Sequence, residues 1–184
     1  MASAQNLILI GSGGRNSGKT FLASAIIKKI ESPVIALKIT SIESHTGLCP
    51  RGGAGCGACS INTDFCLDEE TNINAAKDTS QLLKAGAKKV FWLRCLRSKL
   101  DTAFAAFLEK IKQTDIAEPL IICESNSLRQ TVKPLLFIMI QNEGAVKKSA
   151  QDVLDKADIT LTKNFTQEDI DKIIQHIRRL KMHT

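Results

Sequence analysis

The stretch that most restricts the fold of this chain is LILIGSGGRNSGKTFLASAIIKKI, residues 7–30. Its four consecutive bulky aliphatic residues, 7–10, are typical of a strand buried on both faces, as in a parallel sheet covered by helices. The apolar residues after Thr20 lie on roughly one face of a helix; they are Phe21, Leu22, Ala25, Ile26 and Ile30. A buried strand, a glycine-rich turn and a helix in direct succession indicate an α/β fold.

The glycine-rich turn matches the phosphate-binding pattern G-x-x-x-x-G-K-[ST]. Glycines allow backbone N–H groups to converge on a phosphate at the first turn of the following helix, because no Cβ atoms interfere. In such a loop Lys19 reaches the β- and γ-phosphates, and the Thr20 hydroxyl holds Mg²⁺. The residues that we expect to bind the nucleotide are Gly13, Gly14, Arg15, Asn16, Ser17, Gly18, Lys19 and Thr20. The alternative is a glycine-rich turn that binds nothing.

Apolar runs alternate with helical patterns along the rest of the chain. Strands are expected near residues 6–11, 33–39, 88–94, 119–124, 135–140 and 158–162. Helices are expected near residues 18–31, 73–86, 98–112, 147–157 and 167–181. This order predicts right-handed crossovers and a doubly wound, mostly parallel sheet with helices on both faces, the fold class of P-loop NTPases.

The length and charge of the chain narrow the possible functions. The 184 residues are expected to form one nucleotide-binding domain, residues 1–184, that buries about 70% of its unfolded surface. The first apolar run spans only residues 7–10, so we expect a cytoplasmic protein without a signal peptide or membrane span. The net charge of +6 comes from scattered lysines and only 4% of the residues are aromatic, which favours a small polyanion such as a nucleotide over nucleic acid.

One long segment, from Thr40 to Glu70, has neither a helical nor a strand period, and loops of this length are usually functional. Within this Cys-rich loop, at about residues 41–70, CPRGGAGCGACSINTDFC has the cysteine spacing C-x6-C-x2-C-x6-C. Four thiolates favour Zn²⁺ or an iron–sulfur cluster over hard cations. The expected ligands are Cys49, Cys56, Cys59 and Cys66. His45 could replace one of them, and four reduced thiols without a metal are the alternative.

The other two cysteines, Cys95 and Cys123, lie in or beside aliphatic runs. Reduced cysteine behaves as a small hydrophobic residue in protein interiors. We therefore expect both side chains in the core.

Nucleotide hydrolysis requires an acid near Mg²⁺, usually at the carboxyl end of a strand that neighbours the phosphate-loop strand. Glu124 fits this position because it ends the apolar run PLIICE, although a strand-end acid can also simply face solvent. Asp64 and Asp68 are further candidates, as is Asp78. The expected catalytic residues are Lys19, Glu124, Asp64 and Asp68.

The motif that guanine-specific proteins often carry is incomplete in this chain. That motif, Asn-Lys-x-Asp after a late strand, supplies a carboxylate that accepts two N–H bonds from guanine. The corresponding residues here are Thr162, Lys163, Asn164 and Phe165, so an aromatic ring stands in place of the acid. GTP and ATP, each with Mg²⁺, are therefore both candidate ligands.

A longer run, DFCLDEETNINAAKDTSQLLKAGAKKV at residues 64–90, resembles the molybdopterin-guanine dinucleotide biosynthesis protein B (MobB) family of P-loop proteins. The family pattern is Asp-Phe-x-x-Asp, a short spacer, Lys-Asp-Ser, and Ala-Gly-Ala before a strand. Lys38 and Glu124 also match a lysine and a strand-end glutamate of the family. The matching residues of the run are Asp64, Phe65, Asp68, Lys77, Asp78, Thr79, Ala85, Gly86 and Ala87.

This resemblance implies a homodimeric, GTP-binding accessory factor of molybdenum cofactor biosynthesis that hydrolyses NTP slowly. Its partner would be a molybdopterin nucleotidyltransferase or another molybdoenzyme maturation protein. Two alternatives are open. The first is a metallochaperone or metal-cluster assembly NTPase, in which hydrolysis gates transfer of a metal held by the cysteines. The second is a non-enzymatic nucleotide-binding regulator, in which the Cys-rich loop is a structural zinc site or a redox sensor.

Overall fold

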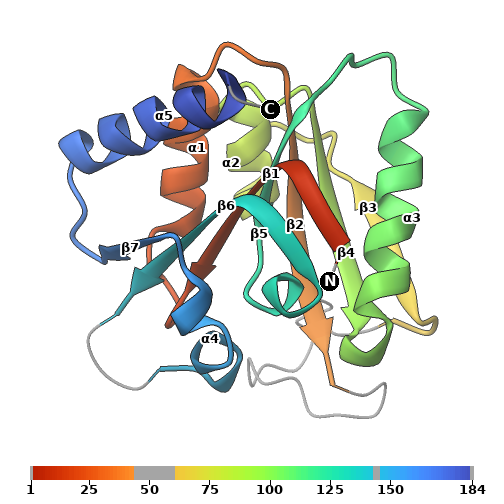
Figure 1. The fold of residues 1–184 in the computed structure, drawn as a ribbon. Coiled ribbons are helices and arrows are strands. Elements are labelled where there is room, and N and C mark those ends of the chain that lie inside the picture. Colours follow the sequence, from red (N-terminus) through yellow and green to blue (C-terminus); the bar gives the residue numbers. More distant parts are fainter. Residues whose placement is uncertain (1, 44–60, 143–145, 183–184) are drawn as a thin grey trace.

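A seven-stranded sheet in the order β3-β4-β2-β5-β1-β6-β7 forms the centre of the molecule (Figure 1). The structure is a computed structural model that describes residues 2–43, 61–142 and 146–182. Within these residues β3 pairs with β4 in antiparallel orientation, and every other pair of neighbours is parallel. The strands are β1 (Ala2–Ser12), β2 (Val34–Ile42), β3 (Phe65–Glu69), β4 (Lys89–Leu96), β5 (Leu120–Glu124), β6 (Val132–Gln141) and β7 (Ile159–Thr162).

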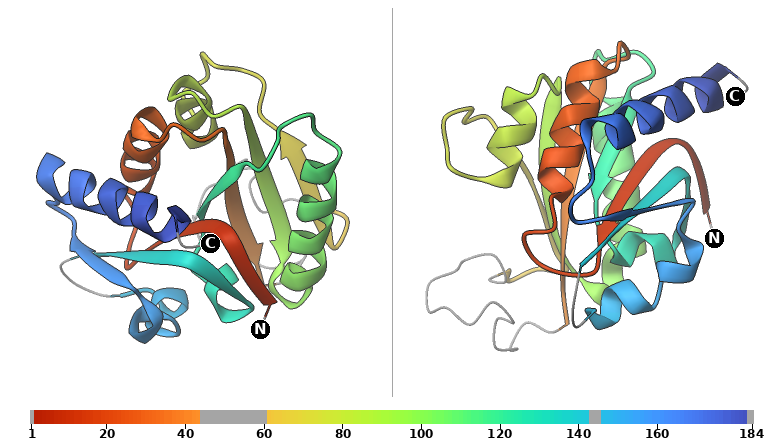
Figure 2. Two further views of the ribbon diagram at one scale, coloured as in Figure 1. Left: turned by 45° about the horizontal axis from the view of Figure 1, so that its top comes forward. Right: turned by 90° about the vertical axis from the view of Figure 1, so that its left-hand side faces the viewer.

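Helices cover both faces of the sheet, as the sequence predicts (Figure 2). α1, α2 and α5 pack on one face, whereas α3, the short helix α4 and the turn η2 pack on the other. None of the described helices is both long and apolar enough to cross a bilayer. The helices are α1 (Lys19–Lys29), α2 (Asp78–Lys84), η1 (Arg97–Lys99), α3 (Leu100–Lys112), η2 (Ser127–Gln130), α4 (Lys148–Gln151), η3 (Leu154–Lys156) and α5 (Gln167–Met182).

The apolar run in β1 accounts for the two-layered core. Successive side chains of a strand point to opposite faces of a sheet. Ile8 and Ile10 accordingly lie in the apolar cluster under α1, α2 and α5, while Leu7 and Leu9 lie in the cluster under α3. All four side chains are fully buried, so the run LILI requires a strand covered on both faces.

The strand order also determines where a ligand can bind. After β1 the chain continues to β2 on one side of it, whereas β6 and β7 are added on the other side. Ligands of open α/β sheets bind outside the carboxyl ends of the strands at such a reversal of strand order. The carboxyl end of β1, where the glycine-rich turn begins, lies at this point.

The prediction that Thr40 to Glu70 contains no strand is wrong at both ends of the segment. β2 continues to Ile42, and Phe65–Glu69 forms β3 at the edge of the sheet. The side chains of β3 are half-buried or exposed, so the strand lacks the apolar run by which buried strands are found in a sequence. Backbone pairing with β4, from Phe65 opposite Cys95 to Glu69 opposite Phe91, defines β3.

The predicted helices at 73–86 and 147–157 form only in part. α2 begins at Asp78, because side-chain oxygens satisfy the backbone upstream of it: Asn72 N–H donates to Glu70 Oε1 and Asn74 N–H donates to Asn72 Oδ1, each at 2.9 Å. Such local bonds compete with a helix. The second segment contains α4, of four residues, and the turn η3. The other predicted helices and all six predicted strands are confirmed, with ends shifted by a few residues.

Candidate functional site

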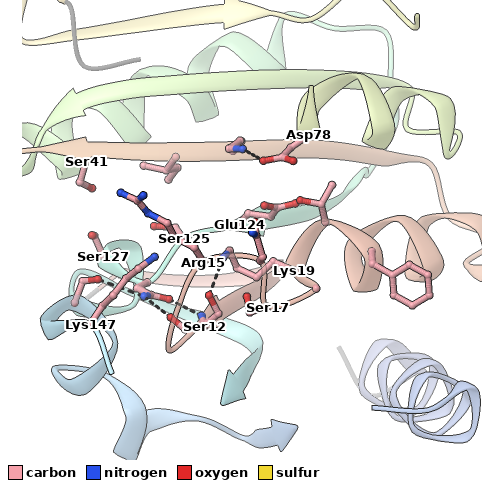
Figure 3. Close-up of a pocket in the computed structure, with 18 of the residues that line it drawn as sticks. Ser12, Arg15, Ser17, Lys19, Ser41, Asp78, Glu124, Ser125, Ser127 and Lys147 are labelled. Atoms are coloured by element: carbon pink, nitrogen blue, oxygen red, sulfur yellow. Dashed lines mark hydrogen bonds and ion pairs between the residues drawn. The ribbon is translucent and has the colours of Figure 1, made fainter. Parts of the chain in front are cut away.

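A cavity of about 680 Å³ opens at the carboxyl ends of β1, β5 and β2 (Figure 3). These strands are neighbours and run in parallel, so the residues that follow them meet at one edge of the sheet. The lining residues come from the glycine-rich loop and the start of α1, from the ends of β2 and β5, from η1 and the start of α2, and from the segment leading into α4. The cavity therefore collects segments that are far apart in the sequence.

The glycine-rich loop is held by its first glycine and turns into α1 at its last. Gly13 N–H donates to Ile140 O of β6 at 2.9 Å, and Gly13 O accepts from Lys147 N–H at 3.0 Å. Gly18 has a φ of +89°, in the left-handed region that side chains rarely adopt. A Cβ at Gly18 would also lie 3.1 Å from the Phe165 ring. A glycine is thus required where the loop enters the helix.

Of the predicted nucleotide-binding residues, six line the cavity and two support the loop. Gly13 is bonded to β6, and the carbonyl of Gly14 accepts a hydrogen bond from Ser12 Oγ at 2.9 Å. The six residues that line the cavity are Arg15, Asn16, Ser17, Gly18, Lys19 and Thr20.

Lys19 folds back over this loop. Its Nζ donates to Ser12 Oγ at 2.7 Å. Burial lowers the pKa of Lys19 below the ordinary 10.5, and the nearby Glu124 carboxyl opposes this shift. A desolvated ammonium group beside converging loop residues is favourable when an anion occupies the cavity, because the anion replaces the lost hydration.

Glu124 is the acid that the structure brings to this loop, as predicted from the end of its strand. It ends β5 opposite Ile10 of β1 and Lys38 of β2, and it is only 4% exposed. Burial raises the pKa of Glu124, although Lys38, Lys19 and a hydrogen bond from the Thr20 hydroxyl counteract the shift. Among the described residues, Glu124 Oε1 has no hydrogen-bond partner. A buried carboxylate oxygen without a partner is costly and is typical of a site that binds something else.

An ion pair joins Lys38 at the end of β2 to Asp78 in the first turn of α2. Both residues line the cavity. The MobB resemblance marks the same two residues, which are far apart in the sequence. The structure therefore places in contact two side chains that the resemblance marks at distant positions of the sequence.

Asn126, which was not predicted from the sequence, fixes the carboxyl end of β1. Its Oδ1 accepts from Ser12 N–H at 2.7 Å, and its Nδ2 donates to Ser12 O at 2.9 Å and to Ser149 Oγ at 3.3 Å. A Cβ at Gly11 would lie 2.8 Å from Asn126 Oδ1, so glycine is needed for this close approach. The signal in the sequence was the polar run Ser-Asn-Ser directly after the buried strand that ends in Glu124.

The cavity lining contains two further cations that were not anticipated, Arg97 and Lys147. Arg97 donates to Glu43 at 3.1 Å and to Asp152 at 3.1 Å, whereas the backbone N–H of Lys147 donates to Gly13 O of the loop at 3.0 Å. Among the residues that the structure describes, the cavity lining has five cationic and three acidic side chains. The cations are Arg15, Lys19, Lys38, Arg97 and Lys147, and the acids are Glu43, Asp78 and Glu124.

Asp64 and Asp68, the other predicted catalytic acids, do not line the cavity. β3 is separated from β1 by four strand spacings, or about 19 Å across the sheet. Asp68 instead pairs with Arg94 at 2.7 Å, and Asp64 pairs with Lys99 at 3.3 Å. These ion pairs account for both carboxylates at the edge of the sheet.

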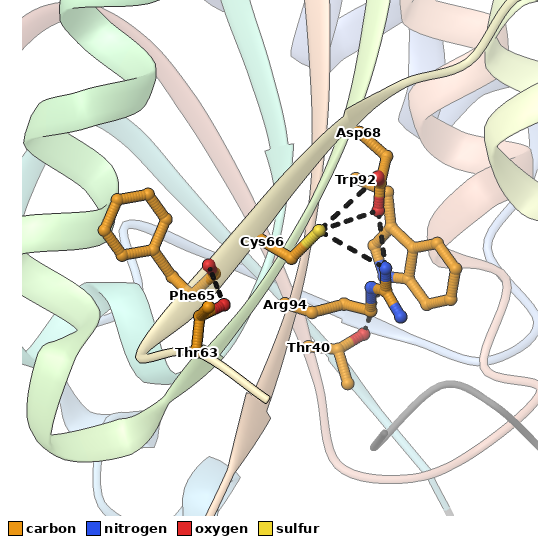
Figure 4. A network of polar contacts seen from close by, with 7 residues as sticks. All are labelled: Thr40, Thr63, Phe65, Cys66, Asp68, Trp92 and Arg94. Carbon is orange, nitrogen blue, oxygen red and sulfur yellow. Dashed lines mark hydrogen bonds and ion pairs between the residues drawn. The ribbon is translucent and has the colours of Figure 1, made fainter. Parts of the chain in front are cut away.

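Cys66 lies in a polar cluster with Asp68, Arg94 and Trp92 on the β3–β4 edge (Figure 4). Its Sγ is 3.4 Å from Asp68 Oδ1 and 3.5 Å from Arg94 Nη2, and the Arg94 guanidinium lies 4.8 Å from the Trp92 ring centroid. In residues 2–43, 61–142 and 146–182 no three His, Cys, Asp or Glu side chains group as metal ligands. The other predicted ligands, Cys49, Cys56 and Cys59, and also His45, lie outside the described residues. The zinc or iron–sulfur site stays a prediction.

Cys95 and Cys123 are fully buried, which confirms their assignment to the core. Burial raises the pKa of Cys95 to about 11 and that of Cys123 well above its ordinary value. Both side chains are therefore protonated thiols at neutral pH and behave as small apolar groups.

No protein-family model, curated protein or solved structure matches this chain. Membership of the MobB family is thus a prediction from the resemblance of residues 64–90, Lys38 and Glu124. The function must be argued from the site, because one α/β architecture supports many functions.

Proposed function

We propose that the protein is a P-loop protein that binds a nucleoside triphosphate with Mg²⁺ in this cavity and hydrolyses it slowly. One observation carries the proposal. The loop that matches the phosphate-binding pattern and the buried acid Glu124 end two neighbouring parallel strands and face the same cavity. A phosphate-binding loop and a strand-end acid in this relation are the parts that phosphoryl transfer requires.

The charge of the cavity supports a polyanionic ligand. The described part of its lining has five cationic and three acidic side chains. Lys38 pairs with Asp78, and Arg97 pairs with Glu43 and Asp152. The Lys19 ammonium donates to the Ser12 hydroxyl, and burial lowers its pKa, which reflects the cost of removing this charge from water. A triphosphate at the loop would offset this cost.

The residues present also fit Mg²⁺. Thr20 offers a hydroxyl oxygen and Glu124 a carboxylate oxygen, the hard ligands that Mg²⁺ prefers. Thr20 would hold the ion, and Glu124 would orient its water shell. When bound, Mg²⁺ neutralises charge on the β- and γ-phosphates. Lys19 would add its charge at the same oxygens, and the loop N–H groups would fix the orientation of the phosphate chain.

The resemblance of residues 64–90 extends the proposal to a biological role. The proposed role is that of a GTP-binding accessory factor in molybdenum cofactor biosynthesis, acting as a dimer beside a molybdopterin nucleotidyltransferase. The ion pair between Lys38 and Asp78 supports this assignment, because the resemblance marks both residues and their side chains meet at the cavity.

The test is a calorimetric titration of the purified chain with Mg-GTP and Mg-ATP. Lys19→Ala is expected to weaken binding at least about tenfold, because a charge-assisted contact to phosphate is worth about 1.5–3 kcal/mol. The matched control is Lys28→Ala, an exposed lysine of the same helix, which should bind as the wild type does. Wild-type protein that binds neither nucleotide, or equal affinity in Lys19→Ala, would remove the proposal.

A further inference from the structure

Phe21, the residue after Thr20, presents an aromatic ring to solvent at the cavity. Its side chain is 63% exposed, and it lines the cavity. The other large hydrophobic side chains that are exposed in the described part of the chain, Ile73 and Met182, do not line it. Phe21 belongs to neither apolar cluster of the core. Because the ring stays exposed, folding does not gain the free energy that its burial would release.

A second aromatic ring supports Phe21 from the protein side. The ring centroids of Phe21 and Phe165 are 6.0 Å apart, with the planes inclined by 39°. Phe165 packs against the core cluster under α1 and closes against Gly18. Phe21 therefore lies beside the glycine-rich loop against a ring that packs on the core, while most of its own side chain is exposed.

The position of Phe165 in the fold adds a second constraint. It follows β7 in a turn closed by a bond from Phe165 N–H to Thr162 O at 3.2 Å, and β7 ends at the same edge of the sheet as β1. This is the place where guanine-specific proteins carry the acid that accepts two N–H bonds. A phenyl ring has no such acceptor, and here it is occupied with Gly18 and Phe21.

We propose that the base of the bound nucleotide stacks on the exposed ring of Phe21, and that the protein accepts adenine and guanine with similar affinity. This inference rests on the proposed function. Stacking on an aromatic side chain is tolerant of base identity, because every base has a π-face. The ligand class is then a purine nucleoside triphosphate recognised by its phosphates and by stacking, in place of the guanine preference that the MobB resemblance implies.

The experiment compares three probes on each variant by calorimetry: Mg-ATP, Mg-GTP and Mg-tripolyphosphate, which has no base. Phe21→Ala should lower the affinity for both nucleotides by about 5- to 150-fold and change the affinity for tripolyphosphate by less than about twofold. Phe21→Trp should retain nucleotide affinity because it preserves the stacking surface. Ile73→Ala, an exposed apolar residue away from the cavity, should bind all three probes as the wild type does.

The outcomes separate this inference from the proposed function. Unchanged nucleotide affinity in Phe21→Ala would overturn stacking, and so would an equal loss of tripolyphosphate affinity, since the effect would then lie in the loop. Wild-type affinity for GTP more than about 50-fold above that for ATP would overturn base tolerance, because stacking alone does not give such discrimination. Wild-type protein that binds none of the three probes would instead remove the proposed function. Tripolyphosphate binding also verifies that Phe21→Ala is folded.

Discussion

The cavity and the β3–β4 edge both combine acids with bases, but they stabilise their charges in different ways. At the edge, the Asp68 carboxylate accepts from Arg94 at 2.7 Å, and its side chain is 48% exposed. In the cavity, Glu124 is 4% exposed, and one of its oxygens lacks a partner among the described residues. An exposed, paired acid is already stabilised. A buried acid with an unused oxygen is stabilised when a ligand or a hydrated cation binds.

This difference favours one acid for the proposed hydrolysis. The sequence predicted Glu124 from its place at the end of a strand and offered Asp64 and Asp68 as further catalytic acids. Burial, strand order and hydrogen bonding favour Glu124 alone, because β3 lies four strand spacings from β1. The following predictions test this contrast.

The largest effect is expected for Glu124→Gln, which keeps the shape of the side chain but removes its charge. Turnover of Mg-GTP should fall about 100-fold, because the amide cannot stabilise the charge that develops on the transferred phosphoryl group. Nucleotide affinity should change only a few-fold. Steady-state phosphate release measures the loss. Glu109→Gln is the control, since Glu109 pairs with Lys112 on the exposed surface of α3. A Glu124→Gln variant with full kcat would assign Glu124 to the structure only.

A smaller effect, on stability, is expected for Asn126→Ala. This change removes three hydrogen bonds and leaves the N–H of Ser12, a residue that is 1% exposed, without its acceptor. The free energy of unfolding should fall by about 2 kcal/mol in urea titrations. Asn72→Ala removes an exposed bond to Asn74 N–H and should change it by less than about 0.5 kcal/mol. Equal losses in the two variants would show that Asn126 does not hold the end of β1.

Local patterns in the sequence predicted most of the fold. The run LILI, the glycine-rich turn and the apolar face of α1 are each contained within a few consecutive residues, and their periods report burial directly. The strand-end position of Glu124 could be predicted in the same way. Strand β3 could not, because its side chains are half-buried or exposed and its identity depends on pairing with β4.

The rest of the cavity could not be predicted because its residues meet only through the topology. Asn126 bonds to Ser12, which lies more than a hundred residues away in the sequence. Similarly, Lys38 of β2 pairs with Asp78 of α2. The distance of Asp64 and Asp68 from the loop likewise follows from the strand order. Spacing in the sequence carries none of this information.

The contrast also predicts a pH dependence. The pKa of Glu124 is raised in the folded protein, chiefly by burial, so between the unfolded value of 4.5 and the raised value the native state binds more protons than the unfolded state. Wild-type stability should therefore decrease as the pH rises through this window. Glu124→Gln lacks this loss, so its stability relative to the wild type should increase from low to neutral pH in urea titrations. A pH-independent difference between the two proteins would contradict the perturbed state of Glu124.

The smallest effect is expected for Asp68→Asn at the β3–β4 edge. Exposed ion pairs contribute about 0–1 kcal/mol, because solvent screens them and the side chains lose entropy on pairing. Asp68 is 48% exposed, so unfolding in urea should shift by less than about 1 kcal/mol, and nucleotide affinity and turnover should match the wild type. Asp78→Asn is the comparison in the cavity, since it frees Lys38 beside Glu124 and should alter nucleotide affinity. If Asp68→Asn lowered turnover as Glu124→Gln does, Asp68 would have to reach the nucleotide in the working protein. The assignment of catalysis to the cavity alone would then be wrong.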